Sequence, residues 1–338
     1  MRTWTLLAHG DPRKVLALRD RPIPEPQPHE VRIRCEGFGL NYADVMAVKG
    51  LYREAPPVPS VLGYEVVGRI DAAGAHVPNA LMGKRVVAMT RFGGYAEYAV
   101  TDHRATSIVP DDMPLGEAAA LATQGCTAWY AAKILCPLFK GQRVLIHSAA
   151  GGVGHLLVQL ALHAGCTVYA IASGKEKMDY LRSLGVQHAI DRSGGHPADQ
   201  VRKALNGARL DVSFNAVGGS SFKKDMDLLG SGGRIVLYGG AERGGLGALG
   251  TLRFVWRMGL VVPIFLMMKS RSILGINMLR IAEHHPEVIA ECARGMVRAH
   301  ADGIIKPRVH AEFPATELPA ALSALEGGRT VGKVVLRW

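Results

Sequence analysis

One glycine-rich segment constrains the fold more than any other part of the chain. An apolar run, Val144–Ile146, is followed by His147 and then by small residues that end at Gly154, and an apolar helical pattern continues to His163. Strand, glycine loop and helix in this order form the dinucleotide-binding fingerprint, with Ala149 in place of its first glycine. Gly151 lets a backbone approach a pyrophosphate, and Gly154 lets the helix pack on the strand. The segment predicts a nucleotide site at a helix N-terminus.

Strands and helices alternate regularly around this loop. Such alternation is typical of a parallel sheet with right-handed crossovers. The first hundred or so residues instead show short alternating strands broken by Gly and Pro, which predicts a β unit. The closing strand 332–337 suits that β unit, so the two ends of the chain are expected to fold together. The strands expected in the sheet cover 143–147, 167–172, 189–191, 212–216 and 234–238, and a further strand is expected over 273–278. The helices are expected over 126–135, 153–163, 175–184, 198–205, 222–229 and 286–300.

The end of the second strand indicates which dinucleotide fits. NAD sites place an acid there, about 20 residues after the loop, to bind the ribose 2′-hydroxyl. Here the strand ends at Ser173 with no Asp or Glu at its tip, and Lys175 and Lys177 follow on either side of Glu176. Cations suit a 2′-phosphate, which favours NADPH. Lysines that merely decorate a solvated helical turn are the alternative interpretation.

The net charge leaves several anionic partners open. The 338 residues include 40 Lys and Arg against 29 Asp and Glu, a formal net charge of +11. Nucleic acid, an anionic membrane and a phosphate-rich cofactor are candidate partners, and an ordinary basic surface is the alternative. The chain has no dense Lys/Arg cluster and no aromatic-plus-basic stacking motif, so there is no strong nucleic-acid signal.

Cysteine spacing and the N-terminus bear on metal binding and location. The five cysteines are too widely spaced for structural zinc, and no metal site is predicted. They are interpreted as small core residues.

The first residues reach the polar stretch 9–12 too soon for a signal peptide, so a cytoplasmic protein is expected.

Residues 246–268 are the one segment that suggests contact with a membrane. Glycines, arginines and Pro263 interrupt its apolar character, so it offers no clean run of about 18 apolar residues. A partly buried helix with a loop is one interpretation. Because cations such as Arg253 and Lys269 bracket aromatic and aliphatic residues, an interfacial amphipathic helix with weak peripheral membrane contact is the other.

Several further motifs are similar to those of one family. They comprise Gly39-Leu40-Asn41-Tyr42-Ala43-Asp44, Gly63-Tyr64-Glu65-Val66-Val67-Gly68, Gly93-Gly94-Tyr95-Ala96-Glu97-Tyr98, Gln124-Gly125-Cys126-Thr127-Ala128 and Val331-Gly332-Lys333-Val334-Val335-Leu336. With the glycine loop, they make the whole chain resemble the zinc-independent quinone oxidoreductase (zeta-crystallin) branch of the medium-chain dehydrogenases/reductases. Within that branch it is most similar to the vesicle amine transport protein-like reductases. Zinc-dependent relatives carry a cysteine in place of Asn41 and a histidine in place of Tyr64.

The resemblance implies an α/β protein with two domains. A GroES-like β domain is expected over 1–122 and again over 263–338, and a doubly wound Rossmann domain that binds NADP over 123–262. The implied activity is zinc-independent, NADPH-dependent transfer of hydride to a quinone or an α,β-unsaturated carbonyl compound (enone). The implied assembly is a homodimer that pairs sheet edges near 234–238 and 273–278. A non-enzymatic protein that uses this fold to bind a membrane surface or RNA is the alternative.

The resemblance also implies site residues. Tyr52 is expected to line the acceptor pocket as a hydrogen-bond donor or stacking surface, and Tyr64 either to narrow that pocket or to add an O–H donor. Arg192 replaces a family tyrosine and is expected to stack on adenine or bind the 2′-phosphate with Lys177. Asp44 and Glu65 are expected to be structural partners of backbone or arginine groups. The candidate catalytic residues are Asn41, Tyr52 and Tyr64, and the candidate cofactor residues are Asn41, Thr127, Ala149, Gly151, Gly152, Val153, Gly154, Ser173, Lys177, Arg192, Tyr238 and Gly239.

Overall fold

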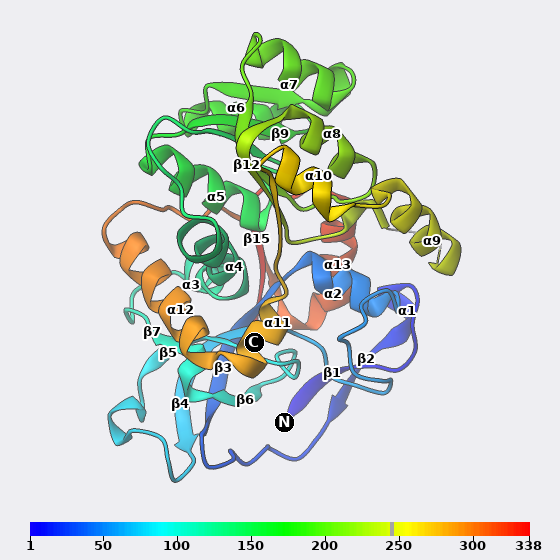
Figure 1. Ribbon diagram of the computed structural model, residues 1–338. Coiled ribbons are helices and arrows are strands. Elements are labelled where there is room, and N and C mark those ends of the chain that lie inside the picture. The colour runs from blue at the N-terminus through cyan, green and yellow to red at the C-terminus, as the bar shows by residue number, and fades with distance from the viewer. Residues whose placement is uncertain (244–246) are drawn as a thin grey trace. The chain divides into compact units, whose positions relative to one another are not determined.

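The computed structural model describes residues 1–243 and 247–338, and the chain forms two compact units (Figure 1). The first unit contains Met1–Cys126 and Met278–Trp338, and the second contains Thr127–Asn277. The chain therefore returns to the first unit after Asn277 and not after residue 262. The reason is that β13 (Ser272–Gly275) pairs in parallel with β12 (Leu229–Leu237) and belongs to the sheet of the second unit.

The first unit is built on a seven-stranded sheet to which both ends of the chain contribute. Strand β15 runs antiparallel to β3, with Val335 opposite Gly39 (Figure 1). This pairing confirms that the closing strand folds with the N-terminal β unit. The path is β14 (Val309–Pro314), β15 (Lys333–Arg337), β3 (Glu30–Leu40), β4 (Glu65–Ala73), β5 (Arg85–Met89) and β7 (Thr106–Ile108), with β6 (Tyr98–Asp102) paired to β3.

Smaller elements complete the first unit. A separate hairpin joins β1 (Arg2–Leu6) to β2 (Leu16–Asp20). Apolar side chains that alternate along β3, among them Val31 and Ile33, are fully buried and form its core with α13. The α-helices are α1 (Pro12–Val15), α2 (Tyr42–Val48), α3 (Leu115–Leu121), α11 (Met278–His284), α12 (Pro286–Ala301) and α13 (Leu318–Glu326), and α4 (Thr123–Trp129) spans the passage to the second unit.

The described residues of the second unit form a six-stranded sheet, in which every pairing is parallel, together with helices. The strand order is β10-β9-β8-β11-β12-β13, which confirms the doubly wound arrangement. The remaining strands are β8 (Arg143–Ile146), β9 (Thr167–Ala172), β10 (His188–Asp191) and β11 (Leu210–Asn215). The helices are α5 (Gly152–His163), α6 (Lys175–Ser183), α7 (Pro197–Leu205), α8 (Ser220–Leu228), α9 (Gly247–Met258) and α10 (Pro263–Met268).

Two predicted elements differ from the structure. The helix expected over 126–135 is α4 followed by a π-helix over Tyr130–Leu135, in which the Cys136 N–H donates to the Ala131 carbonyl. The strand expected over 273–278 stops at Gly275, because the last residue of its partner β12, Leu237, pairs there. Met278 instead begins α11.

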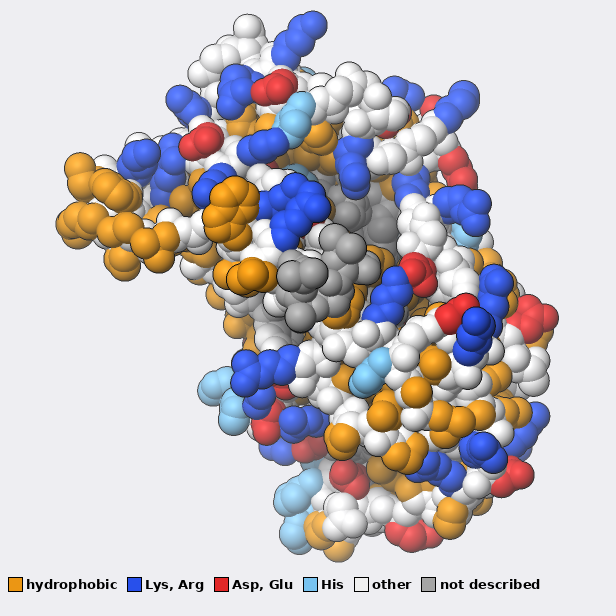
Figure 2. Space-filling view, turned by 90° about the vertical axis from the view of Figure 1, so that its right-hand side faces the viewer, with side chains coloured by type: hydrophobic (Ala, Val, Ile, Leu, Met, Phe, Trp, Pro, Cys, Tyr) orange, Lys and Arg blue, Asp and Glu red, His pale blue; other side chains and the backbone are white. Residues whose placement is uncertain are grey.

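Residues 247–268 form two helices joined by a short loop, while Leu246 lies outside the described residues. The segment is far more exposed than a partly buried helix would be, with Trp256 78% and Leu260 90% exposed. Figure 2 shows a projecting group of hydrophobic side chains at its left edge, with Lys and Arg side chains beside it. None of the helices described here is long and apolar enough to cross a membrane.

Candidate functional site

The glycine loop of the second unit is shaped for close backbone contacts. Ser148 has a positive φ of 51° and turns the chain out of β8. A Cβ on Gly154 would lie 2.2 Å from the Ser148 carbonyl oxygen and 2.8 Å from the Ala149 Cα, so no larger residue fits. Gly151 stands at the N-cap of α5, where no side chain caps the helix. The free N–H groups of this helix end fit the pyrophosphate of a dinucleotide.

The loop lies where the order of the strands reverses. β8 and β11 are neighbours, and the strands that follow each of them extend the sheet in opposite directions. Open α/β sheets bind dinucleotides at this point, outside the carboxyl ends of the strands. A cavity of about 390 Å³ lies there, within the size range of small-molecule sites. Its lining includes His147, Ser148, Ile171, Arg192, Val217 and Lys224.

The structure brings Lys177 and Arg192 together. Burial lowers the pKa of the Lys177 ammonium, Glu176 opposes this effect, and the neighbouring Arg192 guanidinium lowers the pKa further. Neighbouring cations of this kind are the groups that proteins use to bind phosphate. Lys175 does not join them, because its ammonium pairs with the Asp179 carboxylate at 2.7 Å and is 91% exposed.

The other predicted cofactor residues occupy different parts of the second unit. Ser173 is exposed at the end of β9. The Tyr238 N–H donates to the Asn215 carbonyl at 3.2 Å, which holds the end of β12 beside that of β11. A Cβ on Gly239 would lie 2.6 Å from the Ala216 carbonyl oxygen, so this close approach requires glycine. Thr127 is buried in α4.

The first unit contains a buried polar cluster around Asn41. The Lys333 ammonium forms an ion pair with the Glu65 carboxylate, and neither side chain is exposed. Lys333 also donates to the Asn41 side-chain oxygen at 3.3 Å, and the Asn41 amide donates to Glu65 at 3.2 Å. The Thr123 N–H completes the coordination of Glu65 at 2.8 Å. Asn41 is thus held in one orientation by two charged groups.

Lys333 was not among the predicted site residues. The signal that could have found it is its place in the closing strand, where a lysine occurs in an apolar run that the fold buries. Glu65 is a structural partner as expected, but it pairs with this lysine and not with an arginine. Asp44 accepts a hydrogen bond from the Asn41 backbone N–H at 2.7 Å, which helps to start α2. Burial raises the pKa of Asp44 to about 7.

Tyr52 and Tyr64 lie together in the first unit. Their ring centroids are 6.0 Å apart in an edge-on arrangement, and Phe92 packs on Tyr64 at 5.1 Å. Tyr64 is 2% exposed, and its hydroxyl has no hydrogen-bond partner among the described residues. Burial raises the pKa of Tyr52 to about 12 and raises that of Tyr64 above its usual range. Both hydroxyls therefore keep their protons and can donate.

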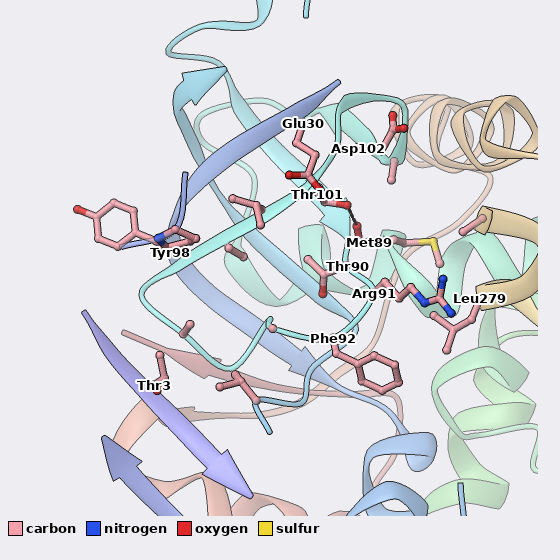
Figure 3. A pocket seen from close by; sticks show the side chains of 18 of the residues that line it. Thr3, Glu30, Met89, Thr90, Arg91, Phe92, Tyr98, Thr101, Asp102 and Leu279 are labelled. Atoms are coloured by element: carbon pink, nitrogen blue, oxygen red, sulfur yellow. Dashed lines mark hydrogen bonds between the residues drawn. The ribbon is translucent and has the colours of Figure 1, made fainter. Parts of the chain in front are cut away.

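A larger cavity, of about 490 Å³, lies elsewhere in the first unit (Figure 3). Figure 3 shows Phe92, Arg91 and Leu279 grouped on one side and Tyr98 on the opposite side, with the Thr101 hydroxyl donating to the Met89 carbonyl at 2.7 Å. None of the predicted catalytic residues lines this cavity. Within residues 1–243 and 247–338, no group of three or more His, Cys, Asp or Glu side chains is placed to hold a metal ion.

Comparison with known proteins identifies the family. Residues 27–111 match the family described as alcohol dehydrogenase GroES-like domain, and residues 152–294 match the family described as zinc-binding dehydrogenase. The human synaptic vesicle membrane protein VAT-1 homolog is 31% identical over 344 residues, which cover 99% of this chain and 86% of that protein. A quinone oxidoreductase of Pseudomonas syringae pv. tomato superposes with a TM-score of 0.87 at 26% identity, over 100% of this chain and 99% of that one. The chain belongs to the quinone oxidoreductase branch of the medium-chain dehydrogenases/reductases, close to the VAT-1 homologues.

Other relatives of this medium-chain dehydrogenase/reductase differ in length and context. The structure of the mycobacterial Rv1454c complexed with NADPH has a TM-score of 0.86 at 29% identity, over 100% of both chains. A mycocerosic acid synthase-like polyketide synthase of Mycobacterium tuberculosis is 27% identical over 311 residues, and the match spans only 14% of that protein. The fold of this family thus occurs both alone and inside longer proteins.

Proposed function

We propose that this protein is an NADPH-dependent reductase that transfers hydride to a quinone or an enone without a zinc ion. The observation that carries the cofactor assignment is that Lys177, in the helix after β9, and Arg192, directly after β10, are neighbours whose charges interact. Two cations there suit a 2′-phosphate and give no advantage to a 2′-hydroxyl. The NADPH in the structure of Rv1454c supports this assignment.

The second unit offers the groups that would hold NADPH. The N–H groups of Gly152, Val153 and the rest of the first turn of α5 would receive the pyrophosphate, and Lys177 and Arg192 the 2′-phosphate. The cavity next to Ser148 and Val217 would take the adenosine. When bound, the cofactor supplies a hydride from its nicotinamide ring.

The first unit offers hydrogen-bond donors for the acceptor. Negative charge develops on the acceptor's carbonyl oxygen during reduction, and donors aimed at that oxygen stabilise it. The Tyr64 hydroxyl suits this role because it is buried, protonated and without a partner among the described groups. Tyr52 supplies a second hydroxyl beside it. Asn41 is held by Glu65 and Lys333 and serves to fix the shape of this site.

Titration with NADPH and NADH, followed by assays with a panel of quinones and enones, tests the proposal. We expect low-micromolar binding of NADPH, clearly weaker binding of NADH, and turnover of at least one acceptor class. Tyr64→Phe should lower kcat about tenfold to a hundredfold with little change in NADPH affinity, because it removes one donor to the developing charge. Absence of NADPH binding, or turnover that Tyr64→Phe leaves unchanged, would contradict the corresponding assignment.

We further propose that the protein acts as a homodimer in the cytoplasm. Strand β13 pairs with β12 at the edge of the described sheet, and exposed apolar side chains of α9 and α10 precede it in the chain. An open strand edge and an exposed apolar surface both fit a second copy of the same chain. The five cysteines, all buried and unpaired, fit a reducing compartment.

Two measurements distinguish a dimer from contact with a membrane. Light scattering measures the oligomeric state, and sedimentation with anionic vesicles measures membrane binding. The double substitution Leu260→Ser with Phe265→Ser should convert the dimer to a monomer, whereas Phe139→Ser, at a site that is 61% exposed elsewhere in the second unit, should not. If the wild type is monomeric and the double substitution instead abolishes sedimentation with anionic vesicles, the surface contacts a membrane and the dimer is wrong.

A further inference from the structure

A buried carboxylate in the second unit accepts hydrogen bonds from two residues of β11 and from the residue that follows β8. Asp225 in α8 is 2% exposed. One of its oxygens accepts from the Ser213 hydroxyl at 2.7 Å and from the Asn215 amide at 2.7 Å, and His147 Nε2 lies 2.8 Å away. Because a carboxylate accepts and the other two groups donate, His147 completes the set with its Nε2–H. Asp225 thus joins α8 to both β8 and β11.

Two of these three partners lead directly into cofactor loops. His147 is the residue before Ser148, where the glycine loop begins. Asn215 ends β11, and its side-chain oxygen accepts from the backbone N–H groups of Val217 at 2.9 Å and Gly218 at 2.8 Å. The loops after β8 and β11 are the two that flank the reversal in strand order. One carboxylate therefore holds the starting residues of both loops.

The same groups line the cavity at this edge of the sheet. His147, Ser148, Val217 and Asp225 all lie on its wall. A group that is part of the wall and is fixed by its own hydrogen bonds keeps the cavity in one shape before a ligand arrives. Preorganisation of this kind increases affinity by removing the cost of ordering the loops on binding.

We propose that Asp225 is a positioning residue for the dinucleotide, which acts by fixing the loops after β8 and β11 through His147 and Asn215. This inference rests on the proposed function for the identity of the ligand. Asp225 would thus support cofactor binding although it neither touches the cofactor's phosphates nor belongs to the glycine motif. Sequence patterns give no sign of it, because Asp225 lies on a helix about 70 residues after the loop that it helps to hold.

Ser213 provides a matched control. Its hydroxyl donates to the same Asp225 oxygen as Asn215, and its side chain is equally buried. It lies inside β11, however, and holds no loop residue. Removing this hydroxyl should lower the stability of the protein without changing the shape of the cavity. Asn215→Ala instead removes an anchor of the loop after β11 and keeps Asp225 in place. A merely structural network would respond alike to both substitutions.

NADPH affinity by fluorescence titration and amide hydrogen exchange together test the proposal. We expect Asp225→Asn and Asn215→Ala to weaken NADPH binding about tenfold or more, since hydrogen bonds to a charged group are lost. Exchange at Val217 and Gly218 should accelerate in both variants. Ser213→Ala should bind NADPH within about twofold of the wild type and exchange normally at these amides, even if it unfolds at lower urea concentration. Equal effects of Ser213→Ala and Asn215→Ala on affinity would overturn the positioning role.

Failure of this proposal is distinguishable from failure of the proposed function. If the wild type binds neither NADPH nor NADH, the proposed function is wrong, and hydrogen exchange alone then decides whether Asp225 fixes the loops. Unchanged exchange at Val217 and Gly218 in Asp225→Asn would overturn that anchoring. If Asp225→Asn does not fold, Asn215→Ala carries the same comparison with Ser213→Ala.

Discussion

Glu65 and Lys333 form an ion pair in which neither side chain is exposed to solvent. The pair joins β4 to the closing strand β15 and links residues 268 positions apart in the sequence. Removing two charges from water is costly, and hydrogen bonds from Asn41 and the Thr123 backbone offset part of that cost. The pair therefore ties the end of the chain to the predicted site residue Asn41.

Loss of one partner of this pair should destabilise the first unit strongly. Lys333→Met leaves the Glu65 carboxylate buried without its counter-charge, and the free energy of unfolding should fall by about 3–5 kcal/mol. Urea unfolding measures the change. The double variant Lys333→Met with Glu65→Gln removes both charges and should recover part of the loss. A single variant within about 1 kcal/mol of the wild type would contradict the uncompensated-charge argument.

Asp44 should make stability depend on pH. Burial raises its pKa to about 7 in the folded protein, whereas an unfolded chain has an ordinary aspartate near about 3.9. Between these values the folded state holds a proton that the unfolded state releases, so the free energy of unfolding falls as pH rises from about 4 to about 7. The loss attributable to Asp44 is at most roughly 4 kcal/mol.

The variant Asp44→Asn isolates this effect. An asparagine oxygen can still accept from the Asn41 N–H but carries no titratable proton. Urea unfolding at pH 5 and pH 8 should show a smaller decrease in stability for Asp44→Asn than for the wild type. Parallel pH dependences in the two proteins would mean that Asp44 is ionised in the folded state.

Gly154 should be intolerant of a side chain. A methyl group there would meet the Ser148 carbonyl oxygen at 2.2 Å, so the loop or α5 has to shift. We expect Gly154→Ala to weaken NADPH binding at least about tenfold and to lower the melting temperature. Gly194→Ala is the control, because the nearest atoms to its added Cβ lie 3.8 Å away on Gln200. Similar losses in both variants would argue against a steric cause.

Local patterns predicted the second unit well because its signals are short-range. The strand, the glycine loop and α5 are contiguous, and the alternation of strands and helices fixes a parallel sheet without knowledge of distant contacts. The end of that unit was harder to predict. Residues 272–275 belong to the second unit because β13 pairs with β12. The apolar pattern of a strand does not show which strand it pairs with.

The candidate site was predicted in part, for a related reason. Lys177 and Arg192 could be proposed from the sequence because each follows a strand end, where parallel sheets bind ligands. Lys333 and Asp225 could not, since their roles depend on buried contacts across 268 and 78 positions in the sequence. The one sign that the sequence offers of such a contact is a charged residue within an otherwise apolar pattern, and this sign does not identify the partner.

Lys177 and Arg192 should determine the preference between cofactors. Substituting both with alanine removes two charge-assisted contacts to the 2′-phosphate, so NADPH affinity should fall about a hundredfold while NADH affinity changes little. Lys175→Ala is the matched control on the same helix, because the Lys175 ammonium is already paired with Asp179. This substitution should leave both affinities within about twofold of the wild type. Fluorescence titration with each cofactor measures the ratio. Equal losses for NADPH and NADH in the double variant would mean that these cations hold the pyrophosphate or the fold and not the 2′-phosphate.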